Sequence, residues 1–251
     1  MIEIRNITKC YRERAVVEKL SFVLPTEKII AFIGSNGAGK STVLSIISRL
    51  IAANEGTVSI DGIELARWDT RELSRRLAVL SQSTHFTLRL TVEDLVRFGR
   101  FPHSQGRITE KDRWVVEQAL EYTGLADLKE RFLDELSGGQ RQTAYIAMAI
   151  AQDTKYILLD EPLNNLDMSR SAKIMTLLRG LVNEKGKTVI IVIHDINFVS
   201  FHADYIVALK HGKLQRFGPV EDIVRPEVLR EIYDMDIAVE NYQGKPLCIY
   251  Y

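Results

Sequence analysis

Residues 34–41 have the types and spacing of a phosphate-binding loop. They read Gly34-Ser35-Asn36-Gly37-Ala38-Gly39-Lys40-Ser41, which fits the pattern G-x-x-x-x-G-K-[ST]. Glycines keep side chains away from the backbone N–H groups that close around a phosphate, and a following helix adds partial positive charge. Lys40 is therefore predicted to reach the β- and γ-phosphates of ATP and Ser41 to ligate Mg²⁺, with Thr42 beside them in the nucleotide site.

The segments on either side of this loop predict the strand and the helix that the motif requires. Residues 28–33 contain an apolar run long enough for a buried strand. After the loop, five apolar side chains share one face of a helix: Val43, Ile46, Ile47, Leu50 and Ile51. The competing interpretation is a plain glycine turn, but its four fixed positions arise by chance in about one chain in a hundred of this length.

A second candidate site lies at the end of another apolar run. Residues 156–159 read as a buried strand, Asp160 and Glu161 follow it directly, and Pro162 stops it. Acids at the carboxyl end of a parallel strand lie at the edge where α/β sheets bind ligands. Asp160 is predicted to hold the hydration shell of Mg²⁺. Glu161, which points elsewhere because strand side chains alternate, is predicted to activate water for attack on a γ-phosphate.

A predicted helix begins at Ser137-Gly138-Gly139-Gln140, and its two glycines are not explained by a helix start alone. Ser137 and Gln140 stand at the spacing of a capping box. The two glycines between them lower helix stability by about 1 kcal/mol each relative to alanine. Their presence is explained if a phosphate must lie against the backbone at this point.

Three further residues gain meaning only from the motifs around them. Tyr11, predicted in a loop, offers an aromatic face on which a purine can stack. Gln82 falls just past a predicted strand at residues 77–80, and His194 follows another at residues 188–193. Taken alone, each is read more simply as an ordinary loop residue.

The composition sets limits on the class of protein. Of 251 residues, 46% are hydrophobic, and 33 Lys and Arg balance 33 Asp and Glu. Zero net charge gives no electrostatic reason to expect nucleic acid as a partner. No apolar run approaches the ~18 residues of a membrane span, and the first residues lack the order of a secretory signal. Cys10 and Cys248 have no neighbours at metal-ligand spacing, so we expect ordinary thiols in a reducing cytoplasm.

Strands and helices alternate along the rest of the chain. Residues 91–152 predict three helices, of which the first two begin after the caps Thr91 and Thr109. Other expected elements are hairpins at 56–63 and 205–217, helices at 70–76 and 167–184, and short pieces from 219 onward. A run of helices within such a pattern predicts a helical subdomain set into an α/β core.

The order and spacing of these motifs resemble the ATP-binding subunits of ABC transporters across essentially the whole chain. Leu136 completes the segment LSGGQ with residues 137–140, and general P-loop proteins lack this signature segment. The resemblance implies an α/β fold with a P-loop NTPase core, an antiparallel β subdomain and an inserted α-helical subdomain. It implies one domain over residues 1–251, with the catalytic core at about 1–85 and 153–217. The helical subdomain would span about 86–152 and a C-terminal extension about 218–251.

The resemblance also implies a role for each matching residue. Tyr11 would stack on adenine, and Gln82 would sense the γ-phosphate or Mg²⁺ and touch the permease. Ser137, Gly139 and Gln140 would grip the γ-phosphate bound to the opposite subunit, with Gly138 among them in the nucleotide site. Asp167 would lie at the dimer seam, and His194 would contact the γ-phosphate.

Members of the family work as head-to-tail dimers with two ATP molecules at the seam. One phosphate loop and one signature segment here imply two copies of this chain. ATP closes the pair, hydrolysis reopens it, and the motion drives a membrane permease on another polypeptide. We therefore expect a peripheral protein at the cytoplasmic face of the inner membrane, held by the permease, with a substrate-binding protein as an indirect partner.

A finer resemblance points to importers of iron siderophores and cobalamin. It is carried by Gly99-Arg100-Phe101-Pro102-His103 and residues 106–112, while residues 150–153 and 160–167 look closest to siderophore members. Two departures stand out: Thr143 replaces the usual Arg after the signature, and Asn164-Asn165 replaces small residues.

Ferric siderophore import is the predicted function, and several alternatives stay open. They are a cobalamin or haem importer ATPase, a non-transport ABC ATPase such as one for DNA repair, ribosomes or iron–sulfur assembly, and a nucleotide-sensing regulator. Glu161 argues against the regulator, because sensing ATP requires no group to activate water.

Overall fold

The structure is a computed structural model, and it describes residues 1–12, 14–81, 89–164 and 166–250. The chain forms two compact units. The terminal unit contains both chain ends and comprises Met1–Trp68 and Thr188–Tyr251, and the middle unit comprises Asp69–Lys187. In the described ranges, no helix is long and apolar enough to cross a membrane.

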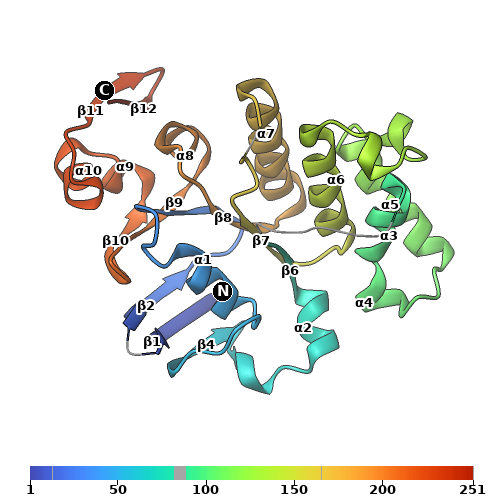
Figure 1. The fold of residues 1–251 in the computed structure, drawn as a ribbon, viewed down its shortest axis with the longest axis horizontal. Coiled ribbons are helices and arrows are strands. Elements are labelled where there is room, and N and C mark those ends of the chain that lie inside the picture. The colour runs from blue at the N-terminus through green and yellow to red at the C-terminus, as the bar shows by residue number, and fades with distance from the viewer. Residues whose placement is uncertain (13, 82–88, 165, 251) are drawn as a thin grey trace. The chain divides into compact units, whose positions relative to one another are not determined.

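An antiparallel sheet in the order β2-β1-β4-β5 forms one layer of the terminal unit, and Figure 1 shows its N-terminal strands in blue. Its strands are β1 (Ile2–Tyr11), β2 (Arg14–Leu24), β4 (Glu55–Ile60) and β5 (Ile63–Glu64). The Asp61-Gly62 turn joins β4 to β5, which confirms that predicted hairpin. Tyr11 was expected in a loop, and this was wrong: it is the last residue of β1 and pairs with Arg14.

A parallel arrangement surrounds the strand that leads into the phosphate loop. That strand, β3 (Ile29–Ile33), pairs in parallel with β8 (Thr188–Val192) and β9 (Tyr205–Lys210), and β10 (Lys213–Pro219) adds antiparallel to β9. Every residue of β3 and β8 is buried. Continuous apolar runs are typical of parallel strands because both faces of such sheets are covered.

The helices of the terminal unit are short. They are α1 (Lys40–Ile47), η1 (Leu65–Arg67), α8 (Ile196–His202), α9 (Val220–Ile223) and α10 (Pro226–Tyr233), followed by the hairpin β11 (Ala238–Tyr242) and β12 (Lys245–Ile249). The prediction that the α1 helix face extends to Leu50 was wrong, since Leu50 is 61% exposed. The helix stops because Arg49 takes a left-handed φ of 59°, which cannot continue a right-handed helix.

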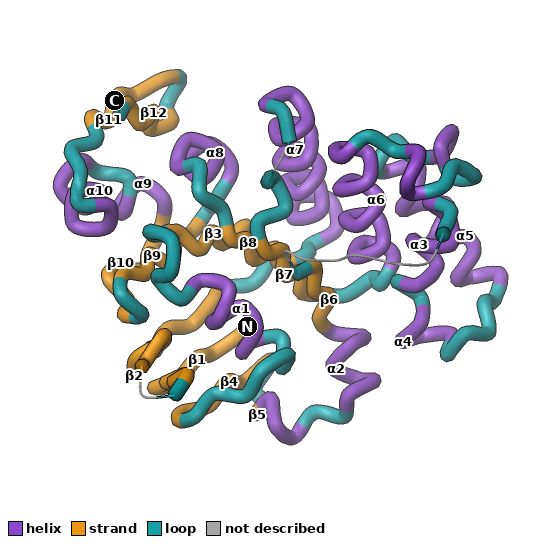
Figure 2. The backbone as a smooth tube through the Cα atoms, viewed as in Figure 1, coloured by secondary structure: helices purple, strands orange, loops and turns teal. Residues whose placement is uncertain are grey.

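The middle unit combines two parallel strands with a group of helices. Strand β6 (Leu77–Leu80) pairs with β7 (Tyr156–Asp160). The helices, purple in Figure 2, are α2 (Thr70–Arg76), α3 (Val92–Phe98), α4 (Phe101–Ser104), α5 (Glu110–Tyr122), η2 (Ala126–Leu128), η3 (Leu133–Glu135), α6 (Gly138–Ala151) and α7 (Met168–Lys185).

Capping residues set where the main helices of this unit begin. Thr91 with Asp94 and Thr109 with Asp112 form complete capping boxes at α3 and α5, as the sequence predicts. Helices α3, α5 and α6 pack on one another. Where the sequence predicted three helices, the structure adds α4 and two single 3₁₀ turns, which are too short to show periodicity.

Candidate functional site

The phosphate loop joins the end of β3 to the start of α1 in the terminal unit. Lys40 is the first residue of α1 and is buried, and its Nζ donates to the carbonyl oxygens of Gly34 at 2.8 Å and Ser35 at 3.0 Å. Ser41 and Thr42 are half-buried in the same first turn. Residues 35–37 are exposed, whereas Ala38 and Gly39 are buried. The loop therefore holds its cation against its own backbone and leaves its tip accessible.

Gly34 is required by its backbone conformation and by its neighbour. Its φ is +133°, a region that residues with side chains rarely adopt, and a Cβ there would lie 2.0 Å from the Leu209 carbonyl oxygen on β9. The backbone of the loop thus approaches β9 too closely for any other residue. This glycine fixes the course of the chain as it leaves β3.

Tyr11 and His194 both present their side chains to solvent in the terminal unit. The Tyr11 side chain is 52% exposed, and Lys9 Nζ lies 5.4 Å from the centroid of its ring. His194 is exposed and follows β8 directly after Ile193. The next residue, Asp195, caps α8 by accepting from the backbone N–H groups of Asn197 and Phe198. Both predicted contact residues thus lie at the surface of this unit.

The C-terminal hairpin holds the helix that follows His194, a contact that no sequence motif indicates. Asn197 Nδ2 donates to the Cys248 carbonyl at 3.0 Å, and the Cys248 N–H donates to Asn197 Oδ1 at 2.8 Å. Burial, with the nearby Asp195 carboxylate, raises the pKa of the Cys248 thiol to about 11. Cys248 is thus a protonated, buried thiol at neutral pH, as the sequence suggested.

In the middle unit, Asp160 and Glu161 differ in burial and in backbone conformation at the end of β7. Asp160 is the last strand residue and is 8% exposed. Glu161 has a left-handed φ of 52° and is half-buried. Strand β7 ends at Asp160 and the backbone turns at Glu161, so the regular alternation of strand side chains does not extend to Glu161. A non-glycine residue held in this region is strained, and such strain is concentrated at functional sites.

Asn164 contacts the Glu161 carboxylate, and sequence reasoning missed this contact. Its Nδ2 donates to Glu161 Oε2 at 2.5 Å, across a turn in which Asn164 N–H also bonds to the Glu161 carbonyl. The residue was noted in the sequence only as a departure from small side chains. Asn165, the second departure, and Gln82, a predicted site residue, lie outside the described residues.

The signature segment begins α6 with the capping box that the sequence predicts. Gln140 N–H donates to Ser137 Oγ at 3.3 Å, and Ser137 N–H donates to Gln140 Oε1 at 3.0 Å. Ser137 and Gly138 are exposed, and Gly139 is buried. Thr143, which stands in place of the usual Arg, donates from Oγ1 to the Gly139 carbonyl at 2.9 Å, a hydrogen bond within α6. Asp167 caps α7 by accepting from Arg170 N–H at 2.8 Å.

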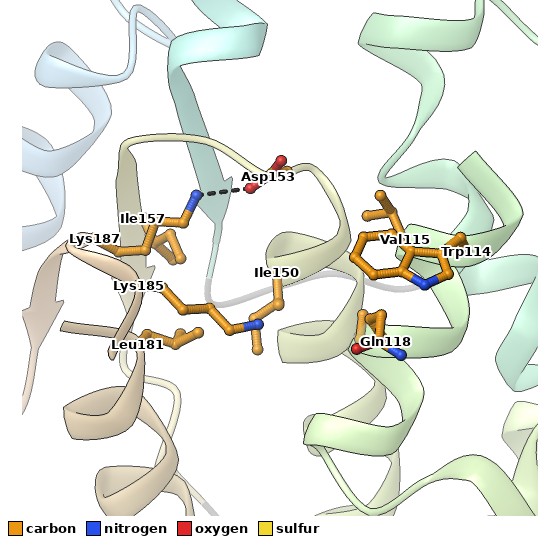
Figure 3. Close-up of a pocket in the computed structure, with 10 residues that line it drawn as sticks. Trp114, Val115, Gln118, Ile150, Asp153, Ile157, Leu181, Lys185 and Lys187 are labelled. Carbon is orange, nitrogen blue, oxygen red and sulfur yellow. Dashed lines mark hydrogen bonds and ion pairs between the residues drawn. The ribbon is translucent and has the colours of Figure 1, made fainter. Parts of the chain in front are cut away.

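A separate cavity of about 260 Å³ lies within the middle unit. Figure 3 shows Trp114, Val115 and Gln118 from α5 on one side and Leu181 and Lys185 from α7 on the other. The ion pair of Lys187 with Asp153, at 2.7 Å, borders it. Of the residues that the structure describes, none of those predicted to bind nucleotide lines this cavity.

Comparisons with known proteins agree with these motifs. A family model described as "ABC transporter" matches residues 17–164. The chain is 53% identical to the petrobactin import ATP-binding protein YclP of Bacillus subtilis (strain 168), covering 100% of both chains. It is 39% identical to the iron(3+)-hydroxamate import ATP-binding protein FhuC of the same organism, covering 96% of this chain and 91% of FhuC.

A solved structure is similar as well. It is the dimeric post-hydrolysis state of the ATP-binding cassette MJ0796 bound to ADP and Pi. The TM-score is 0.78 at 30% identity, and the match covers 88% of this chain and 99% of that one. The fold is therefore the α/β fold of a P-loop ATPase with an antiparallel sheet and inserted helices. Together, the family model and these relatives show that this chain belongs to the ABC transporter family.

Proposed function

We propose that this chain is the ATP-binding and ATP-hydrolysing subunit of an importer that takes up ferric siderophores through a separate membrane permease. The observation that carries the proposal is the phosphate loop, where Gly34 has a conformation that favours glycine and Lys40 Nζ lies against the loop carbonyls. The names of the two curated relatives, one for petrobactin and one for iron(3+)-hydroxamate, support the class of solute.

ATP binds through the backbone of residues 34–39, with Lys40 and Thr42 at its phosphates and Tyr11 stacked on adenine. The exposed Tyr11 ring and the accessible loop tip support this. Ser41 and Asp160 supply a hydroxyl and a carboxylate, and oxygen ligands of this kind fit Mg²⁺, which keeps several waters when bound. Mg²⁺ neutralises charge on the phosphates when it is present.

Hydrolysis uses residues on both sides of the γ-phosphate. Glu161 accepts a proton from water as the water oxygen attacks γ-phosphorus, and the bond to the β–γ bridging oxygen breaks to release ADP. Gln82 and His194 contact the γ-phosphate and help to place that water. The hydrogen bond from Asn164 to Glu161 supports a fixed orientation for the carboxylate.

Two copies of the chain form the working unit. Ser137, Gly138, Gly139 and Gln140 of one copy complete the nucleotide site of the other, which the exposure of Ser137 and Gly138 supports. The partners are the permease, which holds the pair at the cytoplasmic face of the membrane, and indirectly a substrate-binding protein, without nucleic acid. Residues 1–251 act as one ATPase domain, with a helical subdomain at about 86–152 and an extension from about 218.

Uptake by cells tests the solute. A strain that lacks this gene receives either the wild-type chain or Lys40→Ala, and each strain is given radiolabelled iron as petrobactin or as a hydroxamate chelate. We expect the wild type alone to restore uptake of one ferric siderophore, because Lys40 supplies the charge at the phosphates. Restored uptake of cobalamin or haem instead would favour the alternative importers. Restoration by Lys40→Ala would contradict the assigned ATP site.

A further inference from the structure

One side chain, that of Arg170, joins the first turns of α6 and α7. Its Nε lies 3.3 Å from Asp167 Oδ2, in addition to the backbone cap at the same carboxylate. A Cβ built on Gly139 would lie 2.3 Å from Arg170 Cδ and 2.7 Å from its Nη1. The arginine therefore fills the space that any other residue at position 139 would need, while its side chain stays 44% exposed.

The two glycines of the signature segment therefore differ in their surroundings. Gly139 is buried, and its missing side chain makes room for Arg170. Gly138 is exposed, and a Cβ there would meet nothing within 4 Å. The surface at Gly138 is therefore open to a molecule that binds the signature segment. Sequence reasoning explained both glycines by a phosphate at the backbone, and the structure adds a second reason for Gly139, the space that Arg170 occupies.

We propose that Arg170 is a positioning residue of the ATP seam, which holds residues 137–140 and the Asp167 turn in the arrangement to which a second copy of this chain binds. The expected effect on ATP-driven pairing rests on the proposed function. The contacts of Arg170 with Asp167 and Gly139 do not depend on it. An arginine suits this place because its Nε pairs with Asp167 while Cδ and Nη1 occupy the space beside Gly139. Its exposed part also adds positive charge beside the segment that receives the γ-phosphate.

Hydrogen exchange in the ATP-free monomer tests the positioning by itself. We expect Arg170→Ala to speed exchange of the backbone amides of residues 140–143 by about fivefold or more, because the first turn of α6 loses its packing partner. Arg113→Ala is the matched control, since Arg113 also pairs with an acid three residues earlier, Glu110, at 2.7 Å on an exposed helix surface. Equal exchange in Arg170→Ala and Arg113→Ala would overturn the proposal.

ATP-driven pairing tests the consequence. In a Glu161→Gln background, light scattering measures the protein concentration at which half of the chains pair with ATP and Mg²⁺. We expect Arg170→Ala to raise that concentration about tenfold or more, while binding of a fluorescent ATP analogue to the dilute monomer stays unchanged. If the Glu161→Gln parent does not pair but Arg170→Ala alters exchange, the positioning stands and the proposed two-copy site fails. If the parent pairs and Arg170→Ala pairs equally well, the proposal is overturned.

A double-mutant cycle separates the two glycines. Gly139→Ala displaces the flexible end of Arg170, so it should weaken pairing as Arg170→Ala does and add less than about threefold when the two are combined. Gly138→Ala meets no group within its own unit, so its effect should be the same with and without Arg170. Additive effects of Gly139→Ala and Arg170→Ala would show that Gly139 acts independently of the arginine, and would contradict the proposal.

Discussion

The Arg100 guanidinium donates from Nε to Asp112 Oδ1 at 2.9 Å, and the two side chains are only 4% and 5% exposed. Arg100 Nη1 also donates to the Ala151 carbonyl at 2.8 Å, at the end of α6. Asp112 Oδ2 accepts from the Thr109 hydroxyl at 2.7 Å at the start of α5. One buried ion pair therefore ties together the segment after α3, the start of α5 and the end of α6, within the segments that resemble siderophore importers.

Removing one charge of this pair should strongly destabilise the protein. Asp112→Asn leaves a buried guanidinium without its counter-charge, so we expect the free energy of unfolding to fall by about 3 kcal/mol. Glu110→Gln is the matched control, because the Glu110–Arg113 pair is exposed and should contribute about 0.5 kcal/mol or less. Urea denaturation measures both, and equal midpoints for the two variants would contradict the prediction.

The same pair should make stability depend on pH in acid. Burial raises the pKa of Asp112, but hydrogen bonds from Thr109 and the charge and hydrogen bond of Arg100 outweigh it, leaving the pKa below its ordinary value of 3.8. A folded-state pKa below the unfolded value stabilises the protein above pH ~4, and this stabilisation is lost as pH falls through the folded pKa. The difference in unfolding free energy between wild type and Asp112→Asn should therefore shrink below pH ~4. A difference that stays constant down to pH ~2 would argue against it.

Two tyrosine hydroxyls should respond in opposite ways to removal. The Tyr233 hydroxyl is buried beside the Gly34 backbone but makes no hydrogen bond of normal geometry with the described residues, and burial raises its pKa above the ordinary value. Tyr233→Phe should therefore raise the free energy of unfolding by about 1 kcal/mol. Tyr122 donates to the Leu177 carbonyl at 3.0 Å, so Tyr122→Phe should lower it by about the same amount. Thermal denaturation checks both, and a destabilised Tyr233→Phe would reveal a partner for that hydroxyl.

Asn164 should affect the rate of hydrolysis more than the affinity for ATP. If its amide orients the Glu161 carboxylate toward the attacking water, Asn164→Ala should lower kcat about tenfold. The KM for ATP should stay unchanged, because the proposed ATP contacts are made by the phosphate loop at residues 34–42. Steady-state phosphate release measures both constants. A kcat within about twofold of the wild type would show that this hydrogen bond does not matter for turnover.

Features of the fold that depend on a few consecutive residues, such as helix starts, could be predicted from the sequence. Thr91, Thr109 and Ser137 begin helices at the predicted residues, because a cap is decided by three or four consecutive residues. The end of α1 was missed because Leu50 continues the apolar period while Arg49 leaves the helical region. Periodicity reports which faces are apolar and not where the backbone turns.

Contacts between turns could not be read in this way. The hydrogen bond from Asn164 to Glu161 depends on the left-handed φ of Glu161, which no residue pattern marks. The packing of Arg170 on Gly139 joins residues of two helices that are distant in sequence. Motifs in the sequence thus predict the residues of the proposed site, whereas the side chains that contact them are seen only in the fold.

We propose that Glu161 activates water at a site shared by two copies of this chain. Glu161→Gln keeps the size of the side chain but cannot accept the proton, so turnover should fall roughly 10²–10⁴-fold while ATP still binds. Uncleaved ATP should then hold two copies together through residues 34–41 of one and residues 137–140 of the other. Adding Ser137→Arg, a bulky cation at the exposed cap, should abolish pairing without unfolding the chain.

The most direct measurement is size-exclusion chromatography with light scattering on Glu161→Gln, run alongside its rate of ATP hydrolysis. We expect slow hydrolysis and a dimer that forms with ATP and Mg²⁺ but not with ADP. Hydrolysis at the wild-type rate would contradict the role assigned to Glu161, and slow hydrolysis by a protein that stays monomeric with ATP would contradict the shared site.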